Sequence, residues 1–204
     1  MKINPEFLPI IEWWEKDGKQ TVIWCLIAAI AVGGWYGWKN YRASVKNAAS
    51  EALISAMTTD ELETAATKFS SSDAAASIKI RLAKSYYDGG RYNEAMAVYT
   101  ELDGAAPAAF ADIPKVGKAQ CLEALGKFAD AAKAFDDYAE ANPKSYLTLT
   151  AQLGAARSYA QLGDKKKAVS RLDALKAANK EDSLALARIE ATLELVNRYE
   201  VPKK

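Results

Sequence analysis

The sequence contains no histidine, and this absence removes several kinds of active site at once. Serine and cysteine nucleophiles that need an imidazole base are excluded, and so are most zinc sites. The two cysteines, Cys25 and Cys121, form no cluster, and no Gly-rich phosphate-binding or dinucleotide-binding motif is present. The sequence therefore predicts that the protein is not an enzyme and binds no cofactor, metal or small-molecule substrate. The catalytic alternative that remains is a set of Asp and Lys pairs in a cleft.

Neither sign of charge dominates, because the chain has 27 basic and 26 acidic residues. Residues 43–204 contain 22 of each sign and no basic cluster. Domains that bind nucleic acid usually concentrate basic side chains on one face, so no nucleic-acid partner is expected. The charge runs Asp136-Asp137 and Lys165-Lys166-Lys167 are interpreted as solvated faces.

Long apolar runs are also scarce, since a single segment, Thr21 to Trp38, extends for eighteen residues without a charge. As a helix it would span ~27 Å, close to the thickness of the hydrocarbon core of a bilayer. All five tryptophans lie between residues 13 and 38, and those at the two ends fit interfacial aromatic belts. No small-x-small cleavage site follows, so residues 21–38 are predicted to form an uncleaved transmembrane anchor.

The segment before the span, residues 1–20, is predicted to lie in the membrane interface. Its apolar residues recur at helical spacing, and Asp17-Gly18 should break the helix before the span. The apolar positions are Phe7, Ile10, Ile11 and Trp14.

Small residues recur every four positions within the span, at Ala29, Gly33 and Gly37. This spacing lets a second membrane helix approach closely, so the three residues are predicted to form a membrane helix contact. The alternative is the ordinary abundance of Gly and Ala in membrane helices. The positive-inside rule gives no orientation, because the basic residues near the two ends are equal in number. They are Lys2, Lys16 and Lys19 before the span and Lys39, Arg42 and Lys46 after it.

A pattern G-x-x-x-x-A recurs at regular intervals after the span, beginning at Gly90, Gly126 and Gly163, with spacings of 36 and 37 residues. Around each Gly, a small residue lies seven positions before, Tyr or Leu four before, and a bulky residue nine after. In that order they are Ala83, Ala119 and Ala156; Tyr86, Leu122 and Tyr159; and Tyr99, Phe135 and Leu172. The units resemble the tetratricopeptide repeat, a helix-turn-helix of about 34 residues. The sequence thus predicts an all-α fold, with one N-terminal transmembrane helix followed by a TPR-like helical solenoid over residues 43–204.

Less regular units are predicted at both ends of this solenoid. Ala65 and Phe69 match the second helix of a degenerate first unit over residues 45–77. Residues 184–199 should form a terminal capping helix, which a solenoid needs because its last repeat has no neighbour. The apolar stripe of this helix consists of Leu186, Ile189, Leu193 and Val196.

The first helix of each pair lines the concave side of such a solenoid, and its exposed positions are predicted to form a groove that binds protein partners. One apolar position recurs in the three units beside basic residues. The predicted groove consists of Ile80, Arg81, Lys84, Tyr87, Val116, Gln120, Leu153 and Arg157. The alternative is that Ile80, Val116 and Leu153 are ordinary inter-helix packing.

The junction of anchor and domain resembles a more specific family. Trp13-Trp14 precedes Asp17-Gly18-Lys19, the span ends in Gly34-Trp35-Tyr-Gly-Trp38, and a helix rich in small residues follows over 44–57. These features are similar to the YfgM-like family of bacterial inner-membrane proteins, which are ancillary subunits of the Sec translocon. The resemblance implies a cytoplasmic N-terminus, a periplasmic repeat domain, and contacts with translocon subunits and exported proteins.

Two functions are therefore weighed for the anchored solenoid. The first is an interaction module that holds or hands on exported proteins at the Sec channel. The alternative is a cytoplasm-facing scaffold for an envelope assembly or regulatory complex.

We expect the protein to remain with membranes after washing with high salt and with carbonate, at its unprocessed length. The physical reason is the uncharged span with aromatic ends. Immunoblotting of the pellet and N-terminal sequencing check this. Release into the supernatant, or an amino terminus beyond residue 38, would contradict the anchor.

Overall fold

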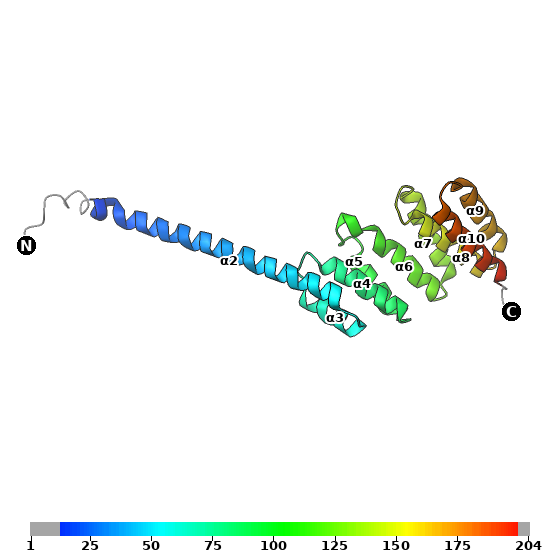
Figure 1. The fold of residues 1–204 in the computed structure, drawn as a ribbon, viewed down its shortest axis with the longest axis horizontal. Helices are drawn as coiled ribbons and strands as arrows, with labels where there is room; N and C mark the ends of the chain where they lie inside the picture. Colours follow the sequence, from blue (N-terminus) through cyan, green and yellow to red (C-terminus); the bar gives the residue numbers. More distant parts are fainter. Residues whose placement is uncertain (1–12, 200–204) are drawn as a thin grey trace, which may run out of the picture. The chain divides into compact units, whose positions relative to one another are not determined.

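The structure is a computed structural model that describes residues 13–199, and every regular element in that range is helical. The predicted all-α fold class is therefore confirmed. The chain divides into two compact units, Met1–Ser50 and Glu51–Lys204, which are described separately. The elements are η2 (Trp14–Gly18), α2 (Lys19–Ser55), α3 (Thr59–Lys68), α4 (Ala75–Asp88), α5 (Tyr92–Leu102), η3 (Ala108–Phe110), α6 (Asp112–Ala124), α7 (Phe128–Ala141), α8 (Thr148–Gln161), α9 (Lys165–Ala178) and α10 (Ser183–Arg198) (Figure 1).

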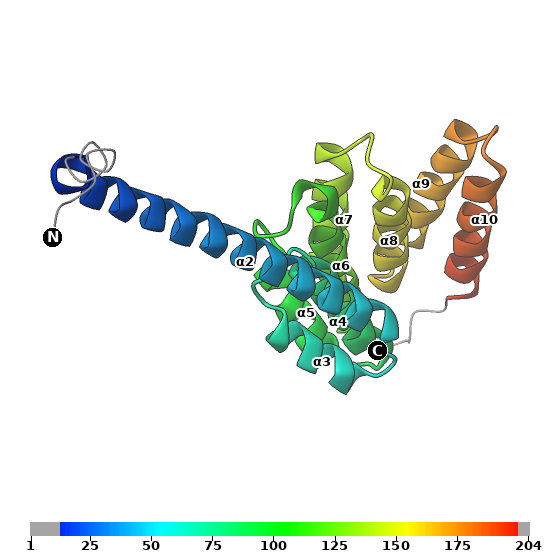
Figure 2. The same ribbon diagram turned by 60° about the vertical axis from the view of Figure 1, so that its left-hand side comes forward.

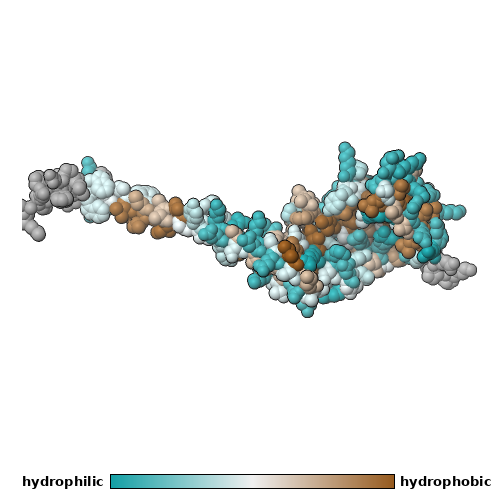
Figure 3. All heavy atoms as spheres, viewed as in Figure 1, coloured by the Kyte–Doolittle hydropathy of each residue, from teal (hydrophilic) through white to brown (hydrophobic). Residues whose placement is uncertain are grey.

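The first unit contains most of α2, which is the one described helix long and apolar enough to cross a membrane. None of its most apolar window is buried by the rest of the protein. Figure 3 shows these apolar side chains as a band along α2. The helix continues beyond the predicted end of the span at Trp38, because the residues that follow contain no Pro or Gly before Ser55. The predicted span 21–38 thus lies inside a helix of 37 residues.

The segment before α2 differs from the prediction. The expected break at Asp17-Gly18 is instead a π-helix, Trp14–Gly18, whose flanking residue Lys19 is also helical. Glycine suits this turn because a Cβ at Gly18 would lie 2.8 Å from Cε3 of the Trp14 ring. Phe7, Ile10 and Ile11 of the predicted amphipathic segment lie outside the described residues.

The second unit stacks helix pairs, α4–α5, α6–α7 and α8–α9, with α3 before them and α10 after them (Figures 1 and 2). The first helices contact one another in order, since α4 contacts α6, α6 contacts α8, and α8 contacts α10. Each second helix packs between the first helix of its own pair and that of the next. This arrangement is the predicted TPR-like solenoid.

The turns explain why glycine recurs at the start of the pattern. Gly90, Gly126 and Gly163 have φ values of 75°, 75° and 89°, a left-handed conformation that glycine adopts without a steric penalty. The next N–H then donates back to the first helix, as from Arg91 to the Tyr86 carbonyl at 2.8 Å. This is the six-to-one bond of a Schellman C-cap, and it reverses the chain within three residues.

The small and bulky positions of the pattern are buried as predicted. The six alanines have relative exposures of 0%, so the two helices of each pair cross closely there. They are Ala83, Ala95, Ala119, Ala131, Ala156 and Ala168. The bulky residues after the turns are also buried, as are Ala65 and Phe69 in the first unit. In α10, Ile189 and Val196 of the predicted stripe are buried, and Leu186 and Leu193 are half-buried.

Two glycines inside helices were not singled out from the sequence. A Cβ at Gly117 would lie 2.6 Å from the Tyr99 ring, and one at Gly154 would lie 2.5 Å from the Phe135 ring. Both glycines occupy the same place, nine residues before the turn glycine. The aromatic ring of one unit therefore packs directly on the helix backbone of the next unit.

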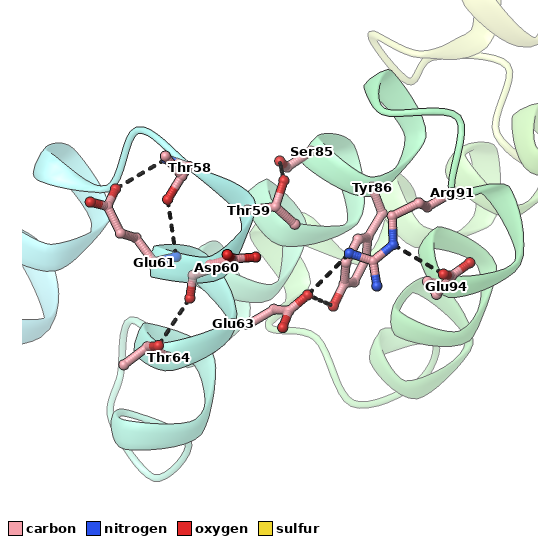
Figure 4. A network of polar contacts seen from close by, with 10 residues as sticks. All are labelled: Thr58, Thr59, Asp60, Glu61, Glu63, Thr64, Ser85, Tyr86, Arg91 and Glu94. Carbon is pink, nitrogen blue, oxygen red and sulfur yellow. Dashed lines mark hydrogen bonds and ion pairs between the residues drawn. The ribbon is translucent and has the colours of Figure 1, made fainter.

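Local capping fixes the start of α3. Thr58 Oγ1 accepts from the N–H of Glu61 at 3.2 Å, and Glu61 Oε2 accepts from the N–H of Thr58 at 3.0 Å, which forms a capping box (Figure 4). The N–H groups of Met57 and Thr58 lower the pKa of the Glu61 carboxyl. The chain thus turns sharply from α2 into α3.

We expect Gly154→Ala to destabilise the repeat domain by ~1–3 kcal/mol, because the new methyl group overpacks against Phe135. An alanine in an open helix position would instead stabilise by up to ~1 kcal/mol. Urea unfolding of the full chain in mild detergent, followed by circular dichroism, measures the change.

The matched background for this experiment is Phe135→Leu, which removes the ring that the methyl group meets. Gly154→Ala should cost less there than in the native chain, since contacting residues are energetically coupled. Equal costs in the two backgrounds would contradict the ring-on-glycine contact.

Candidate partner-binding face

The predicted groove residues fall on the first helices, but two of them are not on a surface. Val116 and Leu153 have exposures of 3%, so their assignment to the groove is wrong. Val116 packs in a cluster with Ala131 and Phe135, and Leu153 packs in another with Leu172 and Ile189. Their side chains point toward the second helices or the capping helix. The apolar recurrence in the sequence therefore reports inter-helix packing at these two positions.

Arg81 also has a structural role, because its guanidinium is already hydrogen-bonded within the protein. Its guanidinium donates to the carbonyl of Leu53 and, at 2.7 Å, to that of Ala56. These carbonyls belong to the end of α2 and the residue after it, where a helix leaves its last acceptors without intrahelical partners. Arg81 lies nine residues before Gly90, where α6 and α8 have Gly117 and Gly154. The first repeat thus replaces the ring-on-glycine contact with a cationic cap for α2.

The remaining predicted residues lie on α4, α6 and α8 and keep some exposure. Ile80, Tyr87, Gln120 and Arg157 are half-buried, and Lys84 is exposed. Lys84 pairs with Asp88 one turn later in α4, at 2.8 Å. Such an exposed pair contributes little to stability.

Arg157 forms an ion pair with Glu123, a residue of α6, and Tyr87 lies near enough for the charges of both residues to act on it. Arg157 Nε and Nη2 donate to the two carboxylate oxygens of Glu123 at 2.8 and 2.7 Å, a bidentate pair. Burial works to lower the pKa of Arg157, but the hydrogen bonds and charge of Glu123 raise it on balance. Burial also raises the pKa of Tyr87, and the charge of Glu123 adds to this. The three side chains come from three successive repeats.

An aromatic contact extends this cluster from α4 to the start of α5. The rings of Tyr87 and Tyr92 meet edge to face, with centroids 5.2 Å apart. We call Tyr87, Tyr92, Glu123 and Arg157 the inner-face cluster. It combines aromatic surface with a fixed, internally neutralised ion pair, a chemistry suited to binding a polypeptide.

A second set of polar contacts ties successive repeats together and was missed from the sequence. Tyr86 donates to Glu63 at 2.7 Å, and Arg91 lies over the Tyr86 ring at 4.3 Å while also bonding Glu63 (Figure 4). Two repeats later, Tyr159 donates to Asp136 at 2.7 Å. In both cases the acid precedes the tyrosine by 23 residues, a spacing that could have indicated the contact.

Asp136 is therefore not part of a solvated charge run. Arg171 donates to both of its oxygens, from Nη1 at 3.0 Å and from Nη2, and Lys167 lies 3.7 Å from the centroid of the Tyr159 ring. The neighbouring Asp137 does fit the sequence interpretation, since it forms an exposed pair with Lys133.

Open hollows also occur beside the second helices. One of about 460 Å³ is bordered by α3, α4 and α5, and one of about 490 Å³ by α5, α6 and α7. The predicted groove residues line neither of them.

The described residues offer little for covalent or metal chemistry. They contain no group of three His, Cys, Asp or Glu side chains placed to hold a metal ion. Cys121 is buried, and burial raises the pKa of its thiol to about 11, which keeps it protonated and unreactive at neutral pH.

The membrane helix contact predicted at Ala29, Gly33 and Gly37 lies on an open surface of α2. All three residues are exposed, and a Cβ at Gly33 or Gly37 would meet nothing within 4 Å. The face is free to approach another helix, and its use stays a prediction.

Comparison with known proteins identifies the repeats. The tetratricopeptide repeat profile matches residues 80–107, 116–145 and 150–180, which correspond to the pairs α4–α5, α6–α7 and α8–α9. The fold is similar to the crystal structure of a tetratricopeptide repeat protein from Parabacteroides merdae, with a TM-score of 0.52 and 19% sequence identity. The match covers 76% of this chain and 60% of that one. A search of curated proteins found no match.

We expect Arg81→Ala to destabilise the repeat domain by ~1–3 kcal/mol, because part-buried carbonyls at the end of α2 lose charged donors. Lys84→Ala, which removes a basic residue from the same helix, should cost no more than ~0.5 kcal/mol. Urea unfolding of both variants measures the difference. Equal costs would show that Arg81 is no more structural than an exposed lysine.

Proposed function

We propose that this chain, with three tetratricopeptide repeats behind an apolar helix, is a membrane-anchored protein–protein interaction module. The repeats support the interaction role, since stacked helix pairs present an extended surface to partners. The observation that carries the proposal is the inner-face cluster, because three successive repeats contribute to it. The unburied apolar helix α2 supports anchoring in a membrane.

The charges of the proposed binding face indicate the kind of segment it accepts. Arg157 is neutralised by Glu123 and Lys84 by Asp88, and Arg81 is engaged with backbone carbonyls. The face therefore offers aromatic surface and hydrogen bonds, with no strong field of either sign. An extended polypeptide of low net charge fits it better than an acidic or phosphorylated one.

We place this module at the Sec translocon, with its repeats on the periplasmic side. The support for this placement is the resemblance of residues 10–60 to the YfgM-like family. In this role α2 contacts a translocon subunit through Ala29, Gly33 and Gly37, and the inner face holds exported chains as they leave the channel. A face without charge preference suits that task, because exported proteins differ widely in sequence.

The test places photo-crosslinking amino acids at Tyr87 and at Gly33 of the full chain in intact cells. We expect the Tyr87 probe to capture exported proteins and the Gly33 probe to capture channel subunits. A probe at Tyr146, which is exposed in the loop between α7 and α8, is the matched control. Its capture gives the background.

Two other crosslinking results would contradict different parts of the proposal. Capture of cytoplasmic proteins alone at Tyr87 would overturn the periplasmic placement and favour the cytoplasm-facing scaffold. Capture at Tyr87 no greater than at Tyr146 would overturn the binding role of the inner face. Protease treatment of spheroplasts checks the orientation independently, since a periplasmic domain is digested without breaking the membrane.

A further inference from the structure

The last helix, α10, has two apolar faces, and the protein covers one of them. Ala185, Ile189, Thr192 and Val196 are buried against α8 and α9. A second row of apolar residues is exposed on a flank of the helix, about a third of a turn around from the buried row. It consists of Leu184, Ala187, Ala191 and Leu195, with Leu184 exposed by 72% and Leu195 by 56%. We call this row the outer stripe.

The spacing of the outer stripe places its members on one helix face. They follow one another by three, four and four residues, which matches the 3.6-residue turn. Two exposed leucines with two alanines between them have the pattern of a helix that packs on a neighbour, and their exposure shows that no described element covers them.

We propose that the outer stripe binds a second copy of this chain, as an antiparallel pair of α10 helices related by a two-fold axis. In such a pair, residues at equal distances from the middle of the stripe face each other. Leu184 then packs on Leu195 of the second copy, and the reverse contact forms at the other end. The two alanines lie at the crossing point, where small side chains allow the helices to approach closely.

The charges at the ends of α10 favour this antiparallel arrangement. The two acidic residues Glu181 and Asp182 lie at its N-terminal end, and Arg198 lies in its last turn. Antiparallel pairing places Glu181 opposite Arg198 of the second copy, whereas parallel pairing would place like charges together. Arg198 already pairs with Glu194, and a guanidinium has enough donors to bond a second carboxylate. The helix dipoles are also opposed.

The size of the stripe sets the strength of the contact. A helix of 16 residues is ~24 Å long, and one of its faces buries much less than the ~800 Å² per partner of a typical stable interface. The contact is therefore weak and depends on protein concentration. Two copies anchored in one membrane have a raised effective concentration, which makes a weak contact sufficient.

Disulfide trapping of the full chain in detergent tests both the contact and its direction. Two variants are made in a Cys25→Ser background, one with Leu184→Cys and one with Leu195→Cys, and each carries a different tag. With a mild oxidant, a mixture of the two should form a crosslinked heterodimer. Either variant alone should form little, because copies of the same residue are offset by ~16 Å along the helices, too far for a disulfide.

A charge at the crossing point provides the second measurement. Ala191→Lys in both chains should lower the mixed adduct about tenfold or more, since position 191 faces Arg188 of the second copy in this register and the substitution places like charges beside each other. Ala174→Lys, at an exposed alanine of α9, is the matched control and should leave the adduct unchanged. Circular dichroism of the two variants compares their folding.

The proposal fails if the mixed adduct does not exceed that of a Leu162→Cys variant, whose site is exposed in the turn after α8. It also fails if same-residue adducts form as readily, or if Ala191→Lys has no more effect than Ala174→Lys. The inner-face cluster takes no part in this contact. A negative result here therefore leaves the proposed function standing, and crosslinks from Tyr87 do not bear on self-association.

Discussion

The stacking of one repeat on the next depends on an aromatic ring that packs against the backbone of a neighbouring helix. Tyr99 meets α6 at Gly117, and Phe135 meets α8 at Gly154, at distances that leave no space for a Cβ. Ring and glycine set how closely consecutive pairs approach. The tyrosine-to-acid bonds then fix the pairs laterally, as between Tyr159 and Asp136. The positions of the exposed residues on α4, α6 and α8 follow from this stacking.

The first repeat departs from this scheme at one residue, and the departure connects the repeats to α2. Arg81 takes the place of the helix glycine and donates to the carbonyls of Leu53 and Ala56. The sequence predicted that Arg81 belongs to a basic groove, because its charge can be read from the sequence. The backbone carbonyls that accept its hydrogen bonds cannot. Backbone carbonyls at a helix end also attract a cation, because they carry partial negative charge and lack intrahelical donors, but no sequence motif marks them.

The inner face and α10 illustrate two consequences of the same periodic pattern. On the inner face, Arg157 of one repeat and Glu123 of another neutralise each other in an ion pair. The surface that remains around this pair is neutral and aromatic. On α10 the buried stripe, including Ile189 and Val196, completes the solenoid, while the outer stripe remains exposed. One helix can thus pack on the stack with one face and present an apolar contact with another.

The sequence by itself determined the helical class, the turns, the alanine crossings and the apolar helix near the N-terminus. These features are local: a left-handed glycine, a small residue at a crossing and an uncharged run are visible within a few residues. The tertiary structure decided which side chains are available. Val116 and Leu153 are buried, and the guanidinium of Arg81 is hydrogen-bonded to backbone carbonyls. The repeat period had predicted all three residues to lie in a groove. The reason is that a repeat period specifies the helix face of a residue, whereas its accessibility depends on the neighbouring helix that packs there.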